Sequence, residues 1–269
     1  MKVFFRVNGA KKDAGALRRD LAAALPEAGL QEAESAEEAD IVIALGGDGT
    51  ILDAVRESPG KPVAGFNIGS LGYLASVERK DFKKALALLA KGKYRIAQRT
   101  MIECRSAKGG AAALNEIALV REHSGRAVTL DISIDGRRAA RYLADGVIFA
   151  TPTGSTAYSL SAGGPILMPD SASLAITPLN PHALAARPVV AGDDVEITVA
   201  AAAREDGLDG SIAVAADGLN VFTLSPGETM ELRKSQRKAF LVEFEGYDPY
   251  EVLSRKLGWP GGGGKEREA

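Results

Sequence analysis

The first hundred residues alternate between short apolar runs and amphipathic stretches, as strands alternate with helices. Residues 41–45 form an unbroken, mostly β-branched apolar run, which is typical of a central parallel strand buried on both faces. This order predicts a doubly wound, Rossmann-like α/β domain over residues 1–98. The other elements expected in it are strands at 3–7 and 62–66 and helices at 13–25, 50–58 and 81–89.

From about residue 99 the apolar positions follow a different period. Residues 128–134 alternate with period two, and Asp135-Gly136 then supplies a hairpin turn before a strand at 137–143. Short strands at such spacing predict an all-β, sandwich-like domain over residues 99–245. Its other expected strands are 146–150, 195–199, 211–215, 221–224, 229–233 and 238–243.

The end of the chain returns to a helical pattern at 249–257. We expect residues 246–259 to pack back onto the first domain as a C-terminal helix. The segment 260–269 is glycine-rich and charged, and we expect it to be a disordered tail.

Composition then narrows the classes of partner. The 33 Lys and Arg residues nearly balance the 35 Asp and Glu residues, so no global basic field attracts nucleic acid or anionic membrane. No apolar run approaches the roughly 20 residues needed to cross a bilayer. A single cysteine, Cys104, excludes an internal disulfide, and with only two histidines a zinc site is not expected. We expect a cytoplasmic protein and assign no side chain as a direct metal ligand.

The first candidate chemistry is the run Gly46-Gly47-Asp48-Gly49-Thr50, which follows the buried strand and opens the next helix. Ligands of doubly wound sheets bind beyond the carboxyl ends of the strands, and N–H groups at a helix N-terminus favour phosphate. The run matches neither the dinucleotide fingerprint nor the P-loop. We therefore predict a phosphate loop of another kind, made by Gly46, Gly47 and Thr50.

Asp48 is unexpected beside phosphate. Even in water, a carboxylate in contact with a polyphosphate is repelled by about 1 kcal/mol per charge. We interpret Asp48 as a group that accepts a proton from an attacking hydroxyl or holds Mg²⁺ through water, both of which belong to phosphoryl transfer. An Asx turn at the strand end is the alternative.

This pentapeptide is similar to the signature shared by NAD kinases, diacylglycerol and sphingosine kinases, and phosphofructokinases. Three further segments narrow the resemblance: Asn115-Glu116, Asp145-Gly146 leading into 151–165, and the stretch 176–188. Together they resemble the NAD kinase family along essentially the whole chain.

The resemblance implies Mg²⁺-dependent transfer of the γ-phosphate of ATP, or of a polyphosphate phosphate in some members, to the 2′-hydroxyl of the adenosine ribose of NAD. Asp48 would be the general base, and the family's tendency implies a homodimer or homotetramer. Another kinase with the same signature, acting on a lipid or small molecule, and a dinucleotide sensor without turnover are the alternatives. The implied NAD contacts are Gly49, Tyr73, Asn115, Glu116, Arg126, Asp145, Thr156, Ala157, Tyr158, Ser159 and Ser161.

Some of these residues can contact NAD only if the local structure meets a specific condition. Neighbouring residues of a strand face opposite sides, so Asn115 and Glu116 reach one ligand only at a strand end or a bulge. An ordinary junction of loop and strand is the alternative for this pair. The segment 151–165 offers hydroxyls and one aromatic ring, Tyr158, for stacking on a base; core packing of that ring is the alternative.

Two positions depart from the family pattern. Some relatives carry a basic residue where this chain has Leu143, so a positive charge near Asp145 would come from Arg141 or Arg126. Asp53 occupies a site that looks basic in many relatives. Both departures leave the diphosphate contacts and the choice of phosphate donor open.

Overall fold

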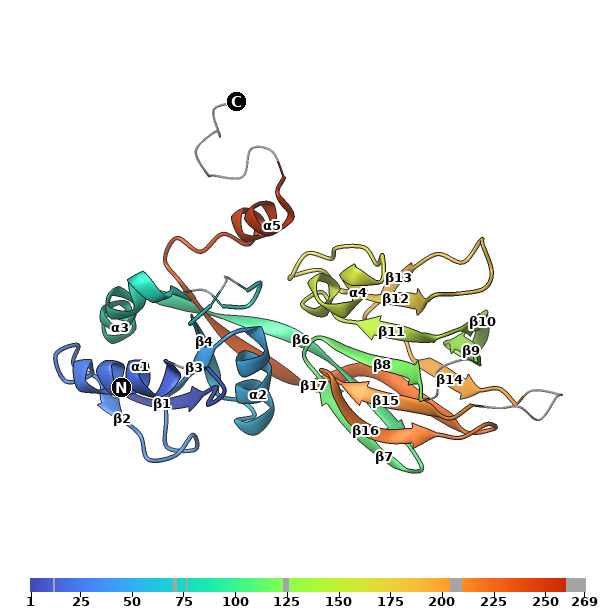
Figure 1. Cartoon of the computed structure of the whole chain (residues 1–269), viewed down its shortest axis with the longest axis horizontal. Coiled ribbons are helices and arrows are strands. Elements are labelled where there is room, and N and C mark those ends of the chain that lie inside the picture. The colour runs from blue at the N-terminus through green and yellow to red at the C-terminus, as the bar shows by residue number, and fades with distance from the viewer. Residues whose placement is uncertain (12, 70–71, 76, 123–125, 204–209, 260–269) are drawn as a thin grey trace. The chain divides into compact units, whose positions relative to one another are not determined.

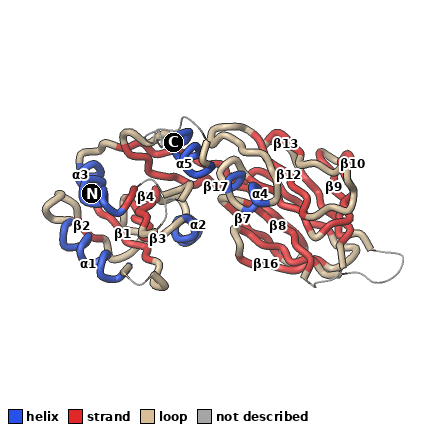
Figure 2. The backbone as a smooth tube through the Cα atoms, turned by 45° about the horizontal axis from the view of Figure 1, so that its top comes forward, coloured by secondary structure: helices blue, strands red, loops and turns tan. Residues whose placement is uncertain are grey.

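The computed structural model describes residues 1–259 except 12, 70, 71, 76, 123–125 and 204–209. The chain divides into two compact units, one made of residues 1–98 and the chain from 239 onward, the other of residues 99–238. Two long strands, β6 (Tyr94–Ser106) and β17 (Thr229–Phe244), carry the chain from one unit into the other. Figure 2 shows helices and strands alternating in the first unit and almost only strands in the second.

The first unit contains a parallel sheet in the order β2-β1-β3-β4, with β5 and the end of β17 also paired to β4. This confirms the predicted doubly wound α/β domain. Its strands are β1 (Lys2–Val7), β2 (Gln31–Glu32), β3 (Ile41–Gly46), β4 (Pro62–Asn67) and β5 (Val77–Glu78), and its helices are α1 (Ala14–Ala24), α2 (Asp48–Glu57), η1 (Arg79–Asp81), α3 (Phe82–Ala90) and α5 (Pro249–Leu257) (Figure 1).

Strand β3 lies at the centre of this sheet, and each of its residues is buried. Ile43 and Leu45 share one core cluster with Leu21 of α1 and Leu86 of α3. The alternate residues of a strand point to the other face, which is covered by α2. Burial on both faces explains why the sequence here is apolar without alternation.

Helix α5 docks onto the first unit, as the sequence predicted. Leu253 is buried, and Arg255 forms a 2.9 Å ion pair with Glu78 of β5. The Lys256 ammonium lies 5.5 Å from the centre of the Tyr73 ring, within the range of a cation–π contact. At its start, Asp248 accepts the backbone N–H of Tyr250 and caps the helix.

The second unit is a sandwich of two antiparallel sheets, which confirms the predicted all-β fold. One sheet has the order β13-β12-β11-β8-β15-β16, and the other contains β10-β9-β14-β17 with β6 and β7. Leu119 and Phe149 from the first sheet and Leu130 and Val199 from the second lie in one core. The remaining strands are β7 (Gly109–Ala113), β8 (Glu116–Arg121), β9 (Val128–Ile134), β10 (Arg137–Ala144), β11 (Gly146–Ala150), β12 (Ser173–Leu179), β13 (Val189–Gly192), β14 (Ile197–Ala201), β15 (Ile212–Ala216) and β16 (Leu219–Leu224), with the short helices η2 (Gly154–Thr156) and α4 (Tyr158–Ser161).

One predicted break in the chain is wrong. The strands expected at 229–233 and 238–243 are a single strand, β17. The polar residues between them do not form a turn, because their side chains bind a neighbouring strand. The hydroxyl of Ser235 donates to the Glu103 carboxylate of β6 at 2.9 Å, and Arg233 Nε donates to the same carboxylate at 2.8 Å. As a result the chain returns to the first unit at Ala239, earlier than the predicted residue 246.

Candidate functional site

In the first unit, Asp48 stands at the carboxyl end of β3 as the first residue of α2. Its carboxylate accepts three consecutive backbone N–H groups, from Tyr73 to Oδ2 at 2.7 Å and from Leu74 and Ala75 to Oδ1 at 3.1 and 3.3 Å. Both oxygens are therefore held in place. A carboxylate offers about four acceptor positions, and the described residues fill one of the two on Oδ2, so the other is left for a hydroxyl of a ligand.

Gly72 makes this approach possible, although the sequence did not single it out. A Cβ atom at Gly72 would lie 1.9 Å from Asp48 Oδ1, which is far inside van der Waals contact. Any other residue would therefore push either the loop or the carboxylate aside. A glycine just before a candidate ligand residue is the only signal that sequence offers for such a role.

The predicted phosphate loop surrounds Asp48. Gly46 ends β3, and the backbone N–H of Gly47 donates to the Thr50 hydroxyl at 3.4 Å. The Thr50 side chain is buried, so this hydroxyl serves the loop itself. Among the described residues, no atom would lie within 4 Å of a Cβ at Gly47 or Gly49, so none of them fills that side of the start of α2.

Tyr73 connects this loop to the C-terminal helix. Its backbone binds Asp48 and its ring faces Lys256. Burial of the ring, and to a smaller extent the negative charge of Asp48, raise the pKa of the Tyr73 phenol. The phenol is therefore a neutral hydrogen-bonding group near pH 7.

In the second unit, Asn115 immediately precedes β8 and Glu116 is the first residue of that strand. This is the strand end that allows neighbouring side chains to reach one ligand. Both residues are buried, each with 7% of its surface exposed. Asn115 Oδ1 and Glu116 Oε2 have no hydrogen-bond partner among the described residues. A buried acceptor without a partner costs about 1–3 kcal/mol, so the pair suits a ligand that brings donors.

The environment of Glu116 also changes its ionisation. Burial, and secondarily the nearby negative charge of Asp217, raise the pKa of the Glu116 carboxyl from 4.5 to about 7. Asp217 was not among the residues predicted from sequence. Its carboxylate accepts the backbone N–H groups of Leu114, Asn115 and Glu116 at 2.8, 2.7 and 3.3 Å.

The segment 151–165 begins against Asn115. The backbone N–H of Thr151 donates to the Asn115 carbonyl at 2.9 Å, and its hydroxyl donates to the Leu114 carbonyl at 2.6 Å. A Cβ atom at Gly154 would lie 2.0 Å from the Asn115 carbonyl oxygen, so only glycine allows this contact. Two sequence segments far apart in the chain thus form one site.

The predicted contacts within this segment differ in access. Tyr158 is 44% exposed, Ser161 is exposed, and Thr156 and Ala157 are half-buried. Ser159 is fully buried, and its hydroxyl shares a 2.9 Å hydrogen bond with Thr177. We therefore assign Ser159 to the packing of the segment and withdraw it from the expected NAD contacts.

Asp145 is not brought beside Asn115 and Glu116. Asp145 precedes β11, whereas the segment that contacts Asn115 follows β11. Strand β11 runs antiparallel to β8 and places its last residue, Ala150, opposite Glu116. Asp145 therefore lies at the other end of β11 from Glu116. At about 3.3 Å per residue, the five-residue strand separates the two ends by roughly 16 Å. One copy of the second unit therefore presents these predicted residues at opposite ends of a sheet.

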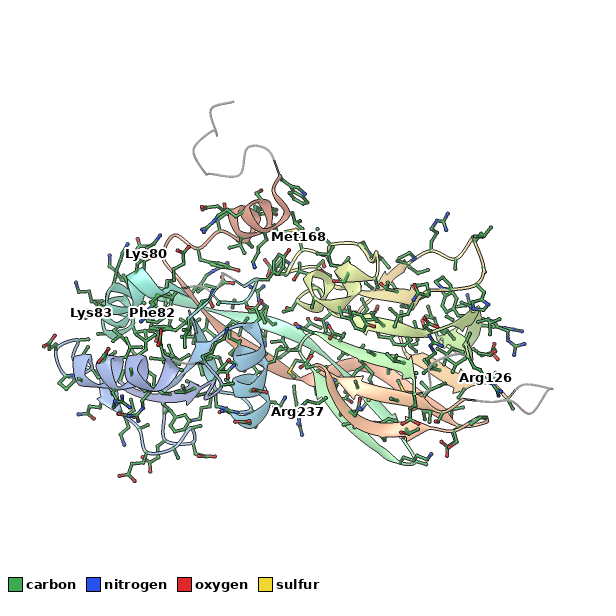
Figure 3. All side chains as sticks on the ribbon, viewed as in Figure 1. Lys80, Phe82, Lys83, Arg126, Met168 and Arg237 are labelled. Atoms are coloured by element: carbon green, nitrogen blue, oxygen red, sulfur yellow. The ribbon has the colours of Figure 1, made fainter. Side chains whose placement is uncertain are left out.

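The charge beside Asp145 comes from a residue that was not expected. Arg121 Nε lies 2.9 Å from one carboxylate oxygen of Asp145, and Asn180 Nδ2 donates to the other at 2.9 Å. The expectation that Arg141 serves Asp145 is wrong, because Arg141 pairs with Asp131 on the neighbouring strand. Arg126 is exposed beside β9, on the far side of the unit from α4 (Figure 3).

No group of three or more His, Cys, Asp or Glu side chains gathers to hold a metal ion within the described part of the chain.

Asp53, the second residue that departs from the family pattern, lies in α2. Its side chain is 39% exposed and forms ion pairs with Arg56 and Arg6.

Over the described residues, no helix is both long and apolar enough to cross a membrane.

Comparisons with known proteins agree with this architecture. The model of the ATP-NAD kinase N-terminal domain matches residues 17–94, and that of the ATP-NAD kinase C-terminal domain matches residues 114–244. An NAD kinase of Symbiobacterium thermophilum is 41% identical over 86% of this chain and 83% of its own length. The fold resembles a yeast NADH kinase crystallised with NADH, with a TM-score of 0.83 at 24% identity over 97% of this chain and 88% of that one. An Archaeoglobus fulgidus NAD kinase in complex with ATP gives a TM-score of 0.78 at 24% identity over 96% of this chain and 98% of that one.

Proposed function

The chain belongs to the ATP-NAD kinase family, and we propose that it transfers the γ-phosphate of ATP to the 2′-hydroxyl of the adenosine ribose of NAD, giving NADP. Asp48 is the general base of this proposal. Its remaining acceptor position on Oδ2 receives the hydroxyl that attacks phosphorus. Because the three N–H donors fix the carboxylate, its contribution is one of orientation as well as proton transfer.

The observation that carries the choice of acceptor substrate is the pair of buried acceptors on Asn115 and Glu116. Adenosine offers the complementary donors, an exocyclic amine and ribose hydroxyls. The exposed ring of Tyr158 supplies a surface on which a base stacks. Gly49, Tyr73, Thr156, Ala157 and Ser161 complete the proposed NAD contacts.

We propose that magnesium arrives with ATP. Mg²⁺ in phosphoryl-transfer sites usually keeps several waters and binds substrate phosphates, so the phosphates of ATP would supply its ligands. The bound ion supplies neutralisation of the charge that develops on the phosphates. The chain's own contribution is the open, glycine-lined start of α2, whose N–H groups and dipole favour a phosphate.

We further propose a self-associated, cytoplasmic protein. About 16 Å of β11 separate Asp145 from Glu116, so both meet one nucleoside only if Asp145 comes from a second copy. A homodimer or homotetramer would supply it, and light scattering after gel filtration gives the number of copies. The single, buried cysteine suits a reducing compartment.

The test is turnover of the purified chain with NAD, ATP and Mg²⁺, followed by an NADP-specific dehydrogenase. We expect NADP to form, and Asp48→Asn to lower kcat by roughly 10²- to 10⁴-fold while NAD still binds in calorimetry. Asp53→Asn, a change of the same kind in the same helix, is the matched control and should keep its turnover.

Each alternative gives a different result. Binding of NAD without NADP formation would identify a dinucleotide sensor, and phosphorylation of a lipid or small alcohol in place of NAD would identify another kinase of the same signature. Near-normal turnover by Asp48→Asn would show that Asp48 is not the general base, while the proposed kinase activity itself would stand.

A further inference from the structure

A hairpin turn in the second unit does more than reverse the chain. Asp217 and Gly218 connect β15 to β16, and their φ angles of 48° and 79° are both left-handed, as in a two-residue hairpin of type I′. Such a turn accepts Asn, Asp or Gly and does not depend on a carboxylate. The direction of the Asp217 side chain therefore needs another explanation.

That side chain leaves its own hairpin and binds the backbone before β8. Oδ2 accepts the N–H of Leu114 at 2.8 Å, and Oδ1 accepts the N–H groups of Asn115 and Glu116 at 2.7 and 3.3 Å. Leu114 and Asn115 lie outside β8, whose pairing begins at Glu116. Their N–H groups would otherwise be left without a partner.

The carbonyls of the same three residues are held as well. The hydroxyl and the N–H of Thr151 donate to the carbonyls of Leu114 and Asn115, and the N–H of Asp217 donates to that of Glu116 at 3.1 Å. Every backbone polar group of residues 114–116 thus has a partner supplied by Asp217 or Thr151. The two side-chain acceptors of this segment are the ones left over.

We propose that Asp217 is a positioning residue for substrate binding, which holds residues 114–116 so that Asn115 Oδ1 and Glu116 Oε2 face the nucleoside of NAD. The proposal rests on the proposed function. Two buried acceptors without partners favour relaxation of the segment toward water or another donor. A fixed backbone opposes this relaxation, so the segment is preorganised before NAD arrives.

The chain supplies a matched control at another hairpin. Asp135 and Gly136 connect β9 to β10 with φ angles of 50° and 72°, nearly those of the Asp217 turn. Among the described residues, the Asp135 side chain accepts one backbone N–H, from Glu196 at 2.9 Å. Asp135→Gly therefore makes the same chemical change at the same kind of turn, away from residues 114–116.

The experiment combines kinetics with amide hydrogen exchange on the full chain. We expect Asp217→Gly to raise the KM for NAD about ten-fold or more, while the KM for ATP stays within about two-fold. In the protein without nucleotide, exchange of a peptide covering residues 114–116 should accelerate by about ten-fold or more. Asp135→Gly should change neither quantity.

Asp217→Asn is a milder variant that keeps the turn and the acceptor at Oδ1. It should fall between wild type and Asp217→Gly in both measurements, and it serves as the test if the glycine variant does not fold. Unchanged exchange at residues 114–116 would overturn the proposal, and so would faster exchange with an unchanged KM for NAD. A wild-type protein that makes no NADP would overturn the proposed function, whereas the exchange data would still decide whether Asp217 holds the segment.

Discussion

The ionisation of Glu116 should make the stability of the unliganded protein depend on pH in a defined window. Its pKa is raised from 4.5 to about 7, first by burial and then by the charge of Asp217. Because the folded state binds the proton more tightly than the unfolded state, this group favours folding below about pH 4.5 and loses that contribution as the pH rises to about 7. At about 1.4 kcal/mol per pKa unit, the full loss is ~3 kcal/mol.

Glu116→Gln keeps the size and the polar atoms of the side chain and removes its titration. The free energy of unfolding should therefore fall by ~2.5 kcal/mol less in this variant than in wild type between pH 5 and pH 8, because part of the full loss lies below pH 5. Urea unfolding of both proteins without nucleotide, at several pH values in this range, measures the difference. Other groups titrate in the same window, but they cancel when the two curves are subtracted.

A second variant checks that the effect belongs to burial and not to the loss of any glutamate. Glu37 is exposed, and hydrogen bonds, chiefly to its own backbone and then to Ser35, lower its pKa below 4.5. Glu37→Gln should therefore leave the curve between pH 5 and pH 8 parallel to that of wild type. If the Glu116→Gln curve is also parallel to that of wild type, Glu116 is ionised in the folded state at pH 5 and the reasoning is refuted.

Two further predictions concern close packing. Gly72→Ala should abolish most NADP formation while the circular dichroism spectrum is retained, because the added Cβ would lie 1.9 Å from Asp48 Oδ1. Gly69→Ala is the control and should stay active, because among the described residues its Cβ would meet only the flexible end of the Lys11 side chain, at 3.4 Å. Equal activity of the two variants would count against the position of the Asp48 carboxylate. Cys104 is buried and its pKa is raised chiefly by burial, so a thiol reagent should label one group per chain in denaturant and almost none in native buffer at pH 8; rapid native labelling would contradict this packing.

The parts of the fold that could be predicted are those in which one short-range pattern decides. The unbroken apolar run of β3 and the period-two alternation of β9 are each a single clear pattern, so both strands lie where the sequence places them. The middle of β17 is polar and therefore resembled a turn in the sequence. Its polar side chains instead bind Glu103 of β6, more than a hundred residues away in sequence. A contact between residues so far apart in sequence cannot be recognised from the local pattern of polar and apolar residues.

The candidate site shows the same division between local and distant information. Asp48, Asn115 and Glu116 stand in recognisable motifs, and the condition that the last two lie at a strand end holds in the structure. The motif did not reveal that Ser159 is committed to Thr177, because burial depends on the whole sheet. Likewise, Arg121 reaches Asp145 only because antiparallel strands bring their ends together.

Two aspartates of this chain make the same kind of backbone contact but serve different roles. Asp48 accepts three consecutive N–H groups at residues 73–75, and Asp217 accepts three at residues 114–116. Each is followed by glycine, so the Asp-Gly pair by itself does not distinguish the two roles. Asp48 stands at the open N-terminus of a helix, where a carboxylate fixed by N–H donors can meet a ligand. Asp217 lies across from a segment whose own side chains carry the vacant acceptors, so its carboxylate fixes the backbone that presents them.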